Sequence, residues 1–396
     1  MPESESAAPS PWWAVSGVVA VYMSFGFAIG LLPPMVDEIS ADLGLTRSAM
    51  GSILGAWALI YIFTAIPGGA MVERLGLRRA MLLGGASIAL SGFLRAVSPS
   101  GLVLFVAVAI FGIGGPLVSI STPKLMATLF DEQSRRLPTG IGVASPGFGS
   151  ALGLALANPV LLPAFDGNWR GVVALGGGVA IAACAYWWWV TSGSDVAGAP
   201  GAPLAPGTFR RLLRLSTVRW ILLLSLFLFA YAHALSGWLP EILVDAGLSD
   251  DVAGYAAAAS IVAGIIGAIA ISRSVPAPRR EHAIGALFLA LALCGIGLAT
   301  LSGAAILAVT IALGFVRSGA MPLMFLVLMD DEDIGPAATG AATGLFFAVA
   351  EVGGFGGPWL VGTIADRTDG FSAATLTLAG IAAVGAVVTT GLARRS

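Results

Sequence analysis

The stretch from Gly69 to Arg79 reads GAMVERLGLRR, a short basic turn between two apolar segments. Each segment is long enough to cross a lipid bilayer, which takes about 20 mostly apolar residues. A short, arginine-rich loop between two spans is typical of the cytoplasmic side of a membrane. The stretch therefore predicts a membrane protein and the side of the membrane that this turn faces.

The composition excludes an ordinary soluble domain. Of the 396 residues, 57% are hydrophobic and 11% are charged, and the mean hydropathy is +0.92. These values lie far from the balance of soluble globular domains. No basic patch typical of nucleic-acid binding occurs, and Cys184 and Cys294 lie in apolar segments, where a thiol behaves as a small hydrophobic group. We expect lipid around most of the chain, and no nucleic-acid partner, metal or cofactor.

Two enzyme classes are excluded by the residues that they require. A P-loop ATPase needs a Gly-Lys-Ser/Thr segment, and the only lysine, Lys124, follows Pro123. No His-Glu-x-x-His motif occurs, and the two histidines offer little capacity for general-base catalysis. We expect no enzymatic activity.

Apolar runs separated by charged residues, prolines and glycines predict twelve transmembrane helices. They cover residues 12–33, 47–70, 79–97, 101–129, 138–162, 170–191, 218–243, 251–273, 282–301, 303–329, 337–363 and 371–392. The predicted organisation is a cytoplasmic tail at 1–11, a six-helix bundle at 12–191, a cytoplasmic linker at 192–217, a second six-helix bundle at 218–392 and a cytoplasmic tail at 393–396.

The two halves resemble each other in sequence. Residues 44–46 read GLT with Gly51 six residues beyond the leucine, and residues 247–249 read GLS with Gly254 at the same interval. Such internal symmetry is typical of secondary transporters, which build one binding site between two repeats. We expect an all-α membrane protein made of two pseudo-symmetric bundles.

Lysine and arginine residues sort to one side of the predicted membrane. Most lie in loops on the side of the two termini, whereas Arg47, Arg170 and Arg367 lie on the other side. The positive-inside rule places the first side in the cytoplasm. We therefore predict a multi-pass protein of the plasma (inner) membrane with both termini cytoplasmic.

The basic turn resembles the signature loop of the major facilitator superfamily, and the resemblance extends along nearly the whole chain. Its glycine, acidic and basic positions are occupied by Gly69, Glu73, Arg74, Gly76, Arg78 and Arg79, with Glu73 in place of the usual aspartate. The resemblance implies the major facilitator fold. It also implies that these six residues form a cytoplasmic latch between helices, which breaks and re-forms during alternating access.

Two other stretches are similar to the cyanate-permease-like and organic-anion uptake branches of that family. They are GIGGP at residues 112–116, continuing to PKL at 123–125, and GWLPEIL at 237–243. The family's proton-coupled drug exporters carry an arginine at the position of Val108, and its absence counts against drug export.

Charged residues inside a membrane are costly and rank first as functional candidates. Arg317 and Glu351 lie near the middle of the tenth and eleventh spans. In one interpretation Arg317 binds an anionic substrate and Glu351 carries the coupling proton. In the other the two residues form a buried ion pair between helices. His233 is a second proton-coupling candidate or a structural histidine, and Lys124 binds substrate or reaches the membrane interface. Arg95 is expected to be an interfacial anchor.

Aromatic residues at helical spacing supply the other candidate substrate contacts. Most aromatic residues in spans pack against helices or form interfacial belts. Each candidate therefore either packs against neighbouring helices or contacts the substrate. The candidates are Tyr22 on the first span, Trp57 and Tyr61 on the second, Tyr231 and Trp238 on the seventh and Phe347 on the eleventh.

Together these features predict a secondary active transporter that moves a small organic anion by alternating access, coupled to protons or by exchange. The alternative is an exporter of hydrophobic or cationic compounds, in which Glu351 and the aromatic residues hold the cation. The two halves joined by a linker favour a carrier over a channel or a sensor. The expected partners are a small-molecule substrate, the bilayer and protons, and we expect a monomer.

Overall fold

The computed structural model describes residues 11–131, 133–192, 207–334 and 336–393. Twelve helical segments in these ranges are long and apolar enough to cross a membrane, as the sequence predicts. All but one residue of each predicted tail, and most of the predicted linker, lie outside the described residues.

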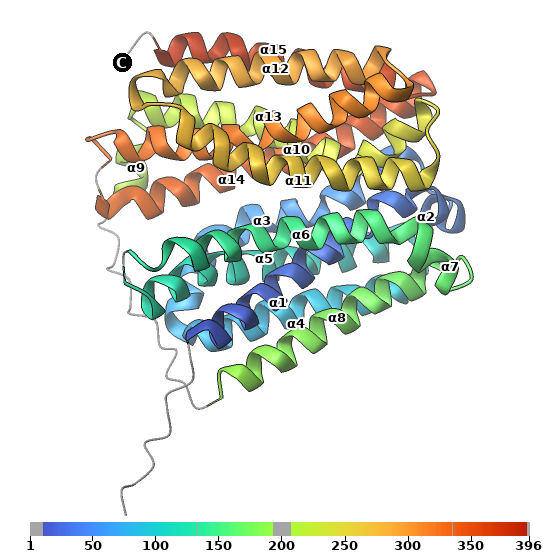
Figure 1. Ribbon diagram of the computed structural model, residues 1–396, viewed down its shortest axis with the longest axis horizontal. Helices are drawn as coiled ribbons and strands as arrows, with labels where there is room; N and C mark the ends of the chain where they lie inside the picture. Colours follow the sequence, from blue (N-terminus) through green and yellow to red (C-terminus); the bar gives the residue numbers. More distant parts are fainter. Residues whose placement is uncertain (1–10, 132, 193–206, 335, 394–396) are drawn as a thin grey trace, which may run out of the picture.

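The helices form two bundles that lie one beside the other (Figure 1). The first bundle contains α1 (Pro11–Gly30), η1 (Pro33–Met35), α2 (Val36–Leu43), α3 (Arg47–Leu75), α4 (Leu77–Ala96), α5 (Gly101–Leu129), α6 (Arg136–Leu156), η2 (Ala157–Leu161), α7 (Leu162–Ala164) and α8 (Trp169–Val190). The second part of the chain contains α9 (Thr208–Leu212), α10 (Ser216–Asp245), α11 (Asp250–Ser274), η3 (Ala277–Arg279), α12 (Arg280–Thr300), α13 (Gly303–Asp330), α14 (Pro336–Thr368) and α15 (Ser372–Ala393).

Helix boundaries follow local sequence signals. Gly44 and Gly76 have φ values of 62° and 75°, in the region that glycine adopts without strain, and they end α2 and α3. The Thr46 hydroxyl caps the start of α3. The sequence-based boundaries miss α2, a short helix that follows the 3₁₀ turn at Pro33 and Pro34.

The two ends of the molecule differ in charge and packing. The end with the α3–α4 turn, α9 and η3 is called the basic end below, and the opposite end, with α2 and α7, is called the far end (left and right in Figure 1). At the far end the bundles approach closely. A Cβ atom on Gly51 of α3 would lie 2.3 Å from the Pro358 carbonyl oxygen of α14, a distance that only glycine permits.

A hydrogen-bonded contact also joins the bundles at the far end. The Asp366 carboxylate of α14 accepts hydrogen bonds from the backbone N–H groups of Arg47 (2.9 Å) and Ser48 (2.8 Å) at the start of α3. Arg47 also lies 3.6 Å from the Asp369 carboxylate. We call the contacts of Asp366 with Arg47 and Ser48 the far-end lock.

A groove of about 1000 Å³ lies between α1 and α6 of the first bundle and α11 of the second. Its apolar walls extend from Ala155 and Ala258 to Arg136 and Arg273 near the basic end. The bundles are therefore in close contact at the far end, and an apolar groove runs along α6 and α11.

Candidate functional site

His233 of α10 and Glu351 of α14 are neighbours at the contact between the bundles. Their Nδ1 and Oε2 atoms lie 3.4 Å apart, and the Glu351 side chain is only 4% exposed. Neither atom has a hydrogen-bond partner among the described residues. Trp57 of the first bundle packs against the His233 ring, with ring centroids 4.9 Å apart. The structure thus brings together the two residues predicted to carry the proton.

Three of the predicted aromatic residues surround this pair. The Tyr61 ring lies 6.3 Å from Trp57 in its own bundle and 6.1 Å from Phe347 in the other. Phe229, which the sequence analysis did not single out, contacts both His233 (5.2 Å) and Phe347 (6.1 Å). Because Phe229 precedes His233 by one helical turn, the helical spacing was the signal that could have found it.

The other aromatic candidates make different contacts. Tyr231 is fully buried, and its hydroxyl donates to a carbonyl of α12 at 2.8 Å. The Trp238 indole N–H donates to a carbonyl of α14 at 2.9 Å. Tyr22 packs against Phe25, with ring centroids 5.7 Å apart. Tyr231 and Trp238 thus contact other helices of their own bundle, and a substrate contact of these two residues or of Tyr22 stays a prediction.

Arg317 of α13 is anchored to α10. Its Nη1 atom donates to the Ala232 carbonyl (3.1 Å) and to the Ser236 hydroxyl (3.2 Å). In the described part of the chain no carboxylate oxygen lies within 4.0 Å of this guanidinium, so the ion pair with Glu351 considered from the sequence is not formed. Arg317 lines a cavity of about 20 Å³ whose walls include Leu154 of the first bundle. Arg317 therefore lies between the bundles with no counter-ion among the described residues.

Arg95 of α4 is a second such cation, and the expectation of an interfacial anchor is wrong. Arg95 is 2% exposed, its Nη1 atom donates to the Ala28 carbonyl at 3.0 Å, and its guanidinium lies 5.2 Å from the centre of the Phe111 ring. It lines a cavity of about 40 Å³ together with His233 and Ser236 of the second bundle. Its place near the end of α4 suggested the interface, but the side chain packs between helices.

Lys124 is paired with the acid of the basic turn. Its Nζ atom lies 3.0 Å from Glu73 Oε1, and the two side chains are 35% and 36% exposed. The ion pair joins α5 to the end of α3. Lys124 thus neutralises Glu73 here, and its contact with substrate stays a prediction.

The rest of the basic turn contacts its own bundle. Arg78 donates to a hydroxyl and a carbonyl at the end of α8 and lies 4.1 Å from the Trp188 ring centre. Arg74 and Arg79 are exposed, and Gly69 has open space around its Cα atom. Within the described ranges the turn forms no ion pair with the second bundle. The predicted latch between helices stays a prediction.

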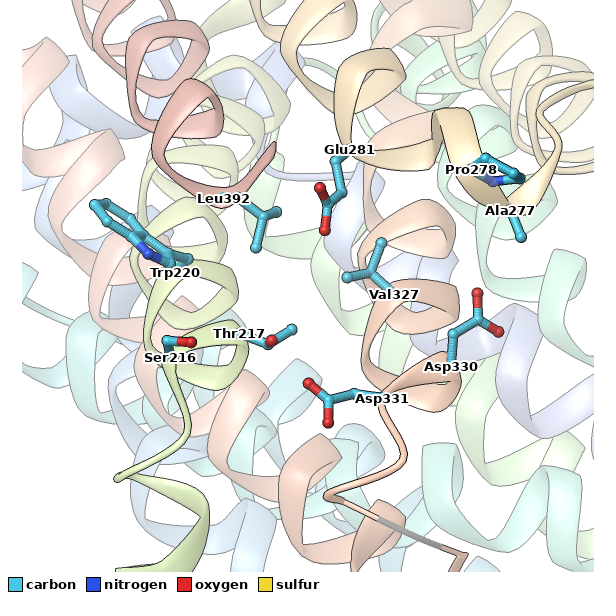
Figure 2. A pocket seen from close by; sticks show the side chains of 10 residues that line it. All are labelled: Ser216, Thr217, Trp220, Ala277, Pro278, Glu281, Val327, Asp330, Asp331 and Leu392. Atoms are coloured by element: carbon cyan, nitrogen blue, oxygen red, sulfur yellow. The ribbon is translucent and has the colours of Figure 1, made fainter. Parts of the chain in front are cut away.

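A separate pocket of about 340 Å³ lies within the second bundle at the basic end (Figure 2). Thr217, Glu281 and Asp331 line it, and the neighbouring Asp330 forms an ion pair with Arg280. Its walls come from α10, η3, α12, α13 and α15, and no helix of the first bundle contributes. The pocket therefore does not lie between the bundles.

Comparison with known proteins identifies sequence relatives. Residues 18–358 match the sequence profile of the Major Facilitator Superfamily. The chain is 30% identical to monocarboxylate transporter 11 of Mus musculus, over 98% of this chain and 89% of that protein. It is 28% identical to the multidrug efflux pump LfrA of Mycolicibacterium smegmatis, but that match spans only 40% of this chain and 32% of the pump.

A solved structure shares the fold. It is a bacterial homologue of the human lysosomal transporter Spinster, in an inward-facing and unoccupied conformation. The TM-score is 0.76, the sequences are 14% identical, and the match covers 98% of both chains. At this identity the likeness establishes the fold alone.

Proposed function

Because this chain belongs to the Major Facilitator Superfamily and is a multi-pass membrane transporter rather than an enzyme, we propose that it moves a small organic anion by alternating access. The transport is coupled to protons or proceeds by exchange. The observation that carries this proposal is Arg317, whose guanidinium lies between the bundles and has no carboxylate partner in the described part of the chain. The name of the monocarboxylate relative, which aligns over nearly the whole chain, points to the same class of substrate.

The energetics of Arg317 favour an anionic ligand. Removing a charged side chain from water costs several kcal/mol unless an opposite charge and further hydrogen bonds compensate. Among the described residues, Arg317 has hydrogen bonds to two groups, both neutral and both on α10, and these offset part of this cost. A substrate carboxylate would supply the missing charge, and the planar guanidinium binds it through two parallel N–H bonds. A ligand held there would touch both bundles, as alternating access requires.

Glu351 and His233 are the proposed proton carriers. Their Nδ1 and Oε2 atoms lie 3.4 Å apart, so a small side-chain movement would bring them into hydrogen-bonding distance, and Trp57 of the opposite bundle packs against the His233 ring. A movement of the bundles would therefore change how far water reaches the pair. Trp57, Tyr61 and Phe347 would enclose the apolar part of the substrate. Lys124, Tyr22, Tyr231 and Trp238, expected from the sequence to bind substrate, are left out of the proposed site.

The basic end is the proposed cytoplasmic side of a plasma-membrane protein, with both termini in the cytoplasm. The distribution of arginines supports this orientation. The far end, where the bundles touch, would then face outward. The groove between α6 and α11 would open inward.

The proposal is tested in liposomes that contain the purified protein. We expect saturable uptake of carboxylates, stimulated by a pH gradient or by the same solute inside the vesicles. Arg317→Gln should abolish carboxylate binding, whereas Arg214→Gln, which removes an exposed arginine, should leave binding unchanged. Undiminished affinity in Arg317→Gln would refute the proposed site.

Export of a lipophilic cation is the second candidate. The partial match to LfrA and the buried Glu351 beside aromatic rings favour it. A thermal-shift screen of carboxylates against lipophilic amines separates the two candidates. Stabilisation by amines alone, lost in Glu351→Gln, would replace the anion carrier with the exporter.

A further inference from the structure

Arg95 and Arg317 are held in the same way by the two bundles. In each, Nη1 donates to a backbone carbonyl in the first long helix of its own bundle, Ala28 of α1 or Ala232 of α10. Neither arginine uses Nε or Nη2 in a hydrogen bond to any described residue. These two nitrogens form an edge with two parallel N–H groups, the geometry that binds a carboxylate. Each arginine therefore presents a free bidentate edge.

The two arginines line cavities that share one residue. Ser236 of α10 lines both the cavity of about 40 Å³ beside Arg95 and the cavity of about 20 Å³ beside Arg317. Each cavity has walls from both bundles. A water molecule needs roughly 10–15 Å³ of such volume, so these spaces hold water but no organic solute. A substrate would fit only after the bundles part.

We infer that Arg95 and Arg317 form a two-point site for an organic dianion, with one carboxylate bound at each arginine. This inference rests on the proposed function and narrows its substrate class from anions to dianions. A monoanion would neutralise one guanidinium and leave the other without a counter-ion between helices, which is costly. A dianion would neutralise both, and it would join the first bundle to the second through its own carbon chain.

A purely structural role for Arg95 accounts for less of what is observed. Its single hydrogen bond to the Ala28 carbonyl uses one of five N–H donors. An uncharged donor would make that bond without the cost of burying a charge. The ring of Phe111, 5.2 Å away, offsets only part of this cost. The charge and the unused donors are explained by an anion.

The test compares dianions with monoanions that differ by one charge. Binding of the α,ω-dicarboxylates malonate to adipate and of their monomethyl esters is measured by calorimetry on the detergent-solubilised protein. We expect at least one diacid to bind at least about tenfold more tightly than its monoester, because charged hydrogen bonds are the strong ones. Arg95→Gln should remove this preference, and Arg95→Lys, which keeps the charge but not the bidentate edge, should weaken it, while monoester binding persists in both. Arg317→Gln should weaken both ligands.

A variant that leaves Arg95 in place covers the case in which its substitution prevents folding. Val108, 1% exposed, lines the cavity beside Arg95, and Val108→Met should fill that cavity and remove the preference for the diacid. Equal affinity for diacids and monoesters in the wild-type protein would overturn the dianion inference but leave the anion carrier intact. If the preference for the diacid survived in both Arg95 variants, Arg95 would not belong to the site. If the Arg95 variants did not fold, a preference that survived in Val108→Met would have the same meaning. If the wild-type protein bound no carboxylate, the proposed function itself would fail.

Discussion

Substituting Asp366 by alanine should shift the molecule toward a state that is open at the far end. The Asp366 carboxylate caps α3 across the bundle interface through the N–H groups of Arg47 and Ser48. Loss of a helix cap costs about 1 kcal/mol, within a range of about 0.5–2, and loss of a negative charge at a helix N-terminus adds about 0.3–1 kcal/mol. Asp366 is exposed, so we take the lower part of the combined range, about 1–2 kcal/mol. This corresponds to a population shift of roughly 5–30-fold.

The shift is measured as a distance between the bundles at the far end. Spin labels on Ala164→Cys of α7 and Asp251→Cys of α11, both exposed, would be placed in a background without Cys184 and Cys294. Pulsed electron paramagnetic resonance would then report the distance distribution. With the lock intact we expect one short distance, and in Asp366→Ala we expect a second, longer component.

Asp245→Ala is the matched control. Asp245 also caps a helix at the far end, because its carboxylate accepts a hydrogen bond from the Phe371 N–H at 3.0 Å, just before α15. Both elements belong to the second bundle, so the control removes a cap within one bundle and leaves the hydrogen bonds of Asp366 in place, although the Phe371 ring lies 5.6 Å from the Arg47 guanidinium of the first bundle. An unchanged distance distribution in Asp366→Ala, or the same change in both variants, would refute the far-end lock.

Three further predictions concern the interior and the basic turn. Glu351→Gln should reduce pH-driven uptake at least about tenfold, the equivalent of 1.4 kcal/mol, while counterflow exchange continues; equal loss of both would argue against a proton-carrying role. Lys124→Met frees Glu73 and should lower stability by no more than about 1 kcal/mol, because the pair is partly exposed, with an unchanged transport KM; a raised KM would return Lys124 to the substrate site. Tyr231→Phe should destabilise the protein by about 1 kcal/mol in thermal unfolding through one lost buried hydrogen bond, and a fall in substrate affinity would contradict its packing role.

The spans were predictable because a bilayer demands long apolar runs. The sixth predicted span, 170–191, differs from α8 (Trp169–Val190) by one residue at each end. The short helix α2 was missed because its eight residues, which include Asp37 and Glu38, resemble a polar loop. The break before it was readable in principle, since Pro33 and Pro34 cannot continue the hydrogen-bond ladder of α1.

The members of the candidate site were easier to predict than their partners. Arg317, Glu351 and His233 stand out because charged and titratable residues are rare in apolar spans. Which way each side chain points depends on how its helix is rotated, and helices that are apolar on most sides give little sign of that rotation. Arg317 and Glu351 lie at similar depth in adjacent spans, so the sequence allowed an ion pair between them. In the structure Glu351 lies beside His233, and Arg317 donates a hydrogen bond to α10.

The far-end lock and a bound dianion act on the same equilibrium between bundle arrangements. A ligand shifts such an equilibrium only by the difference between its affinities for the two states. The lock contributes about 1–2 kcal/mol, whereas each charged hydrogen bond of a bound carboxylate contributes about 1.5–3 kcal/mol, so ligand contacts made in one state only would outweigh the lock. If the binding-competent state is closed at the far end, Asp366→Ala should therefore weaken apparent dianion affinity by no more than its own population shift, roughly 5–30-fold. A larger loss of affinity would mean that Asp366 contacts the ligand or its binding residues directly.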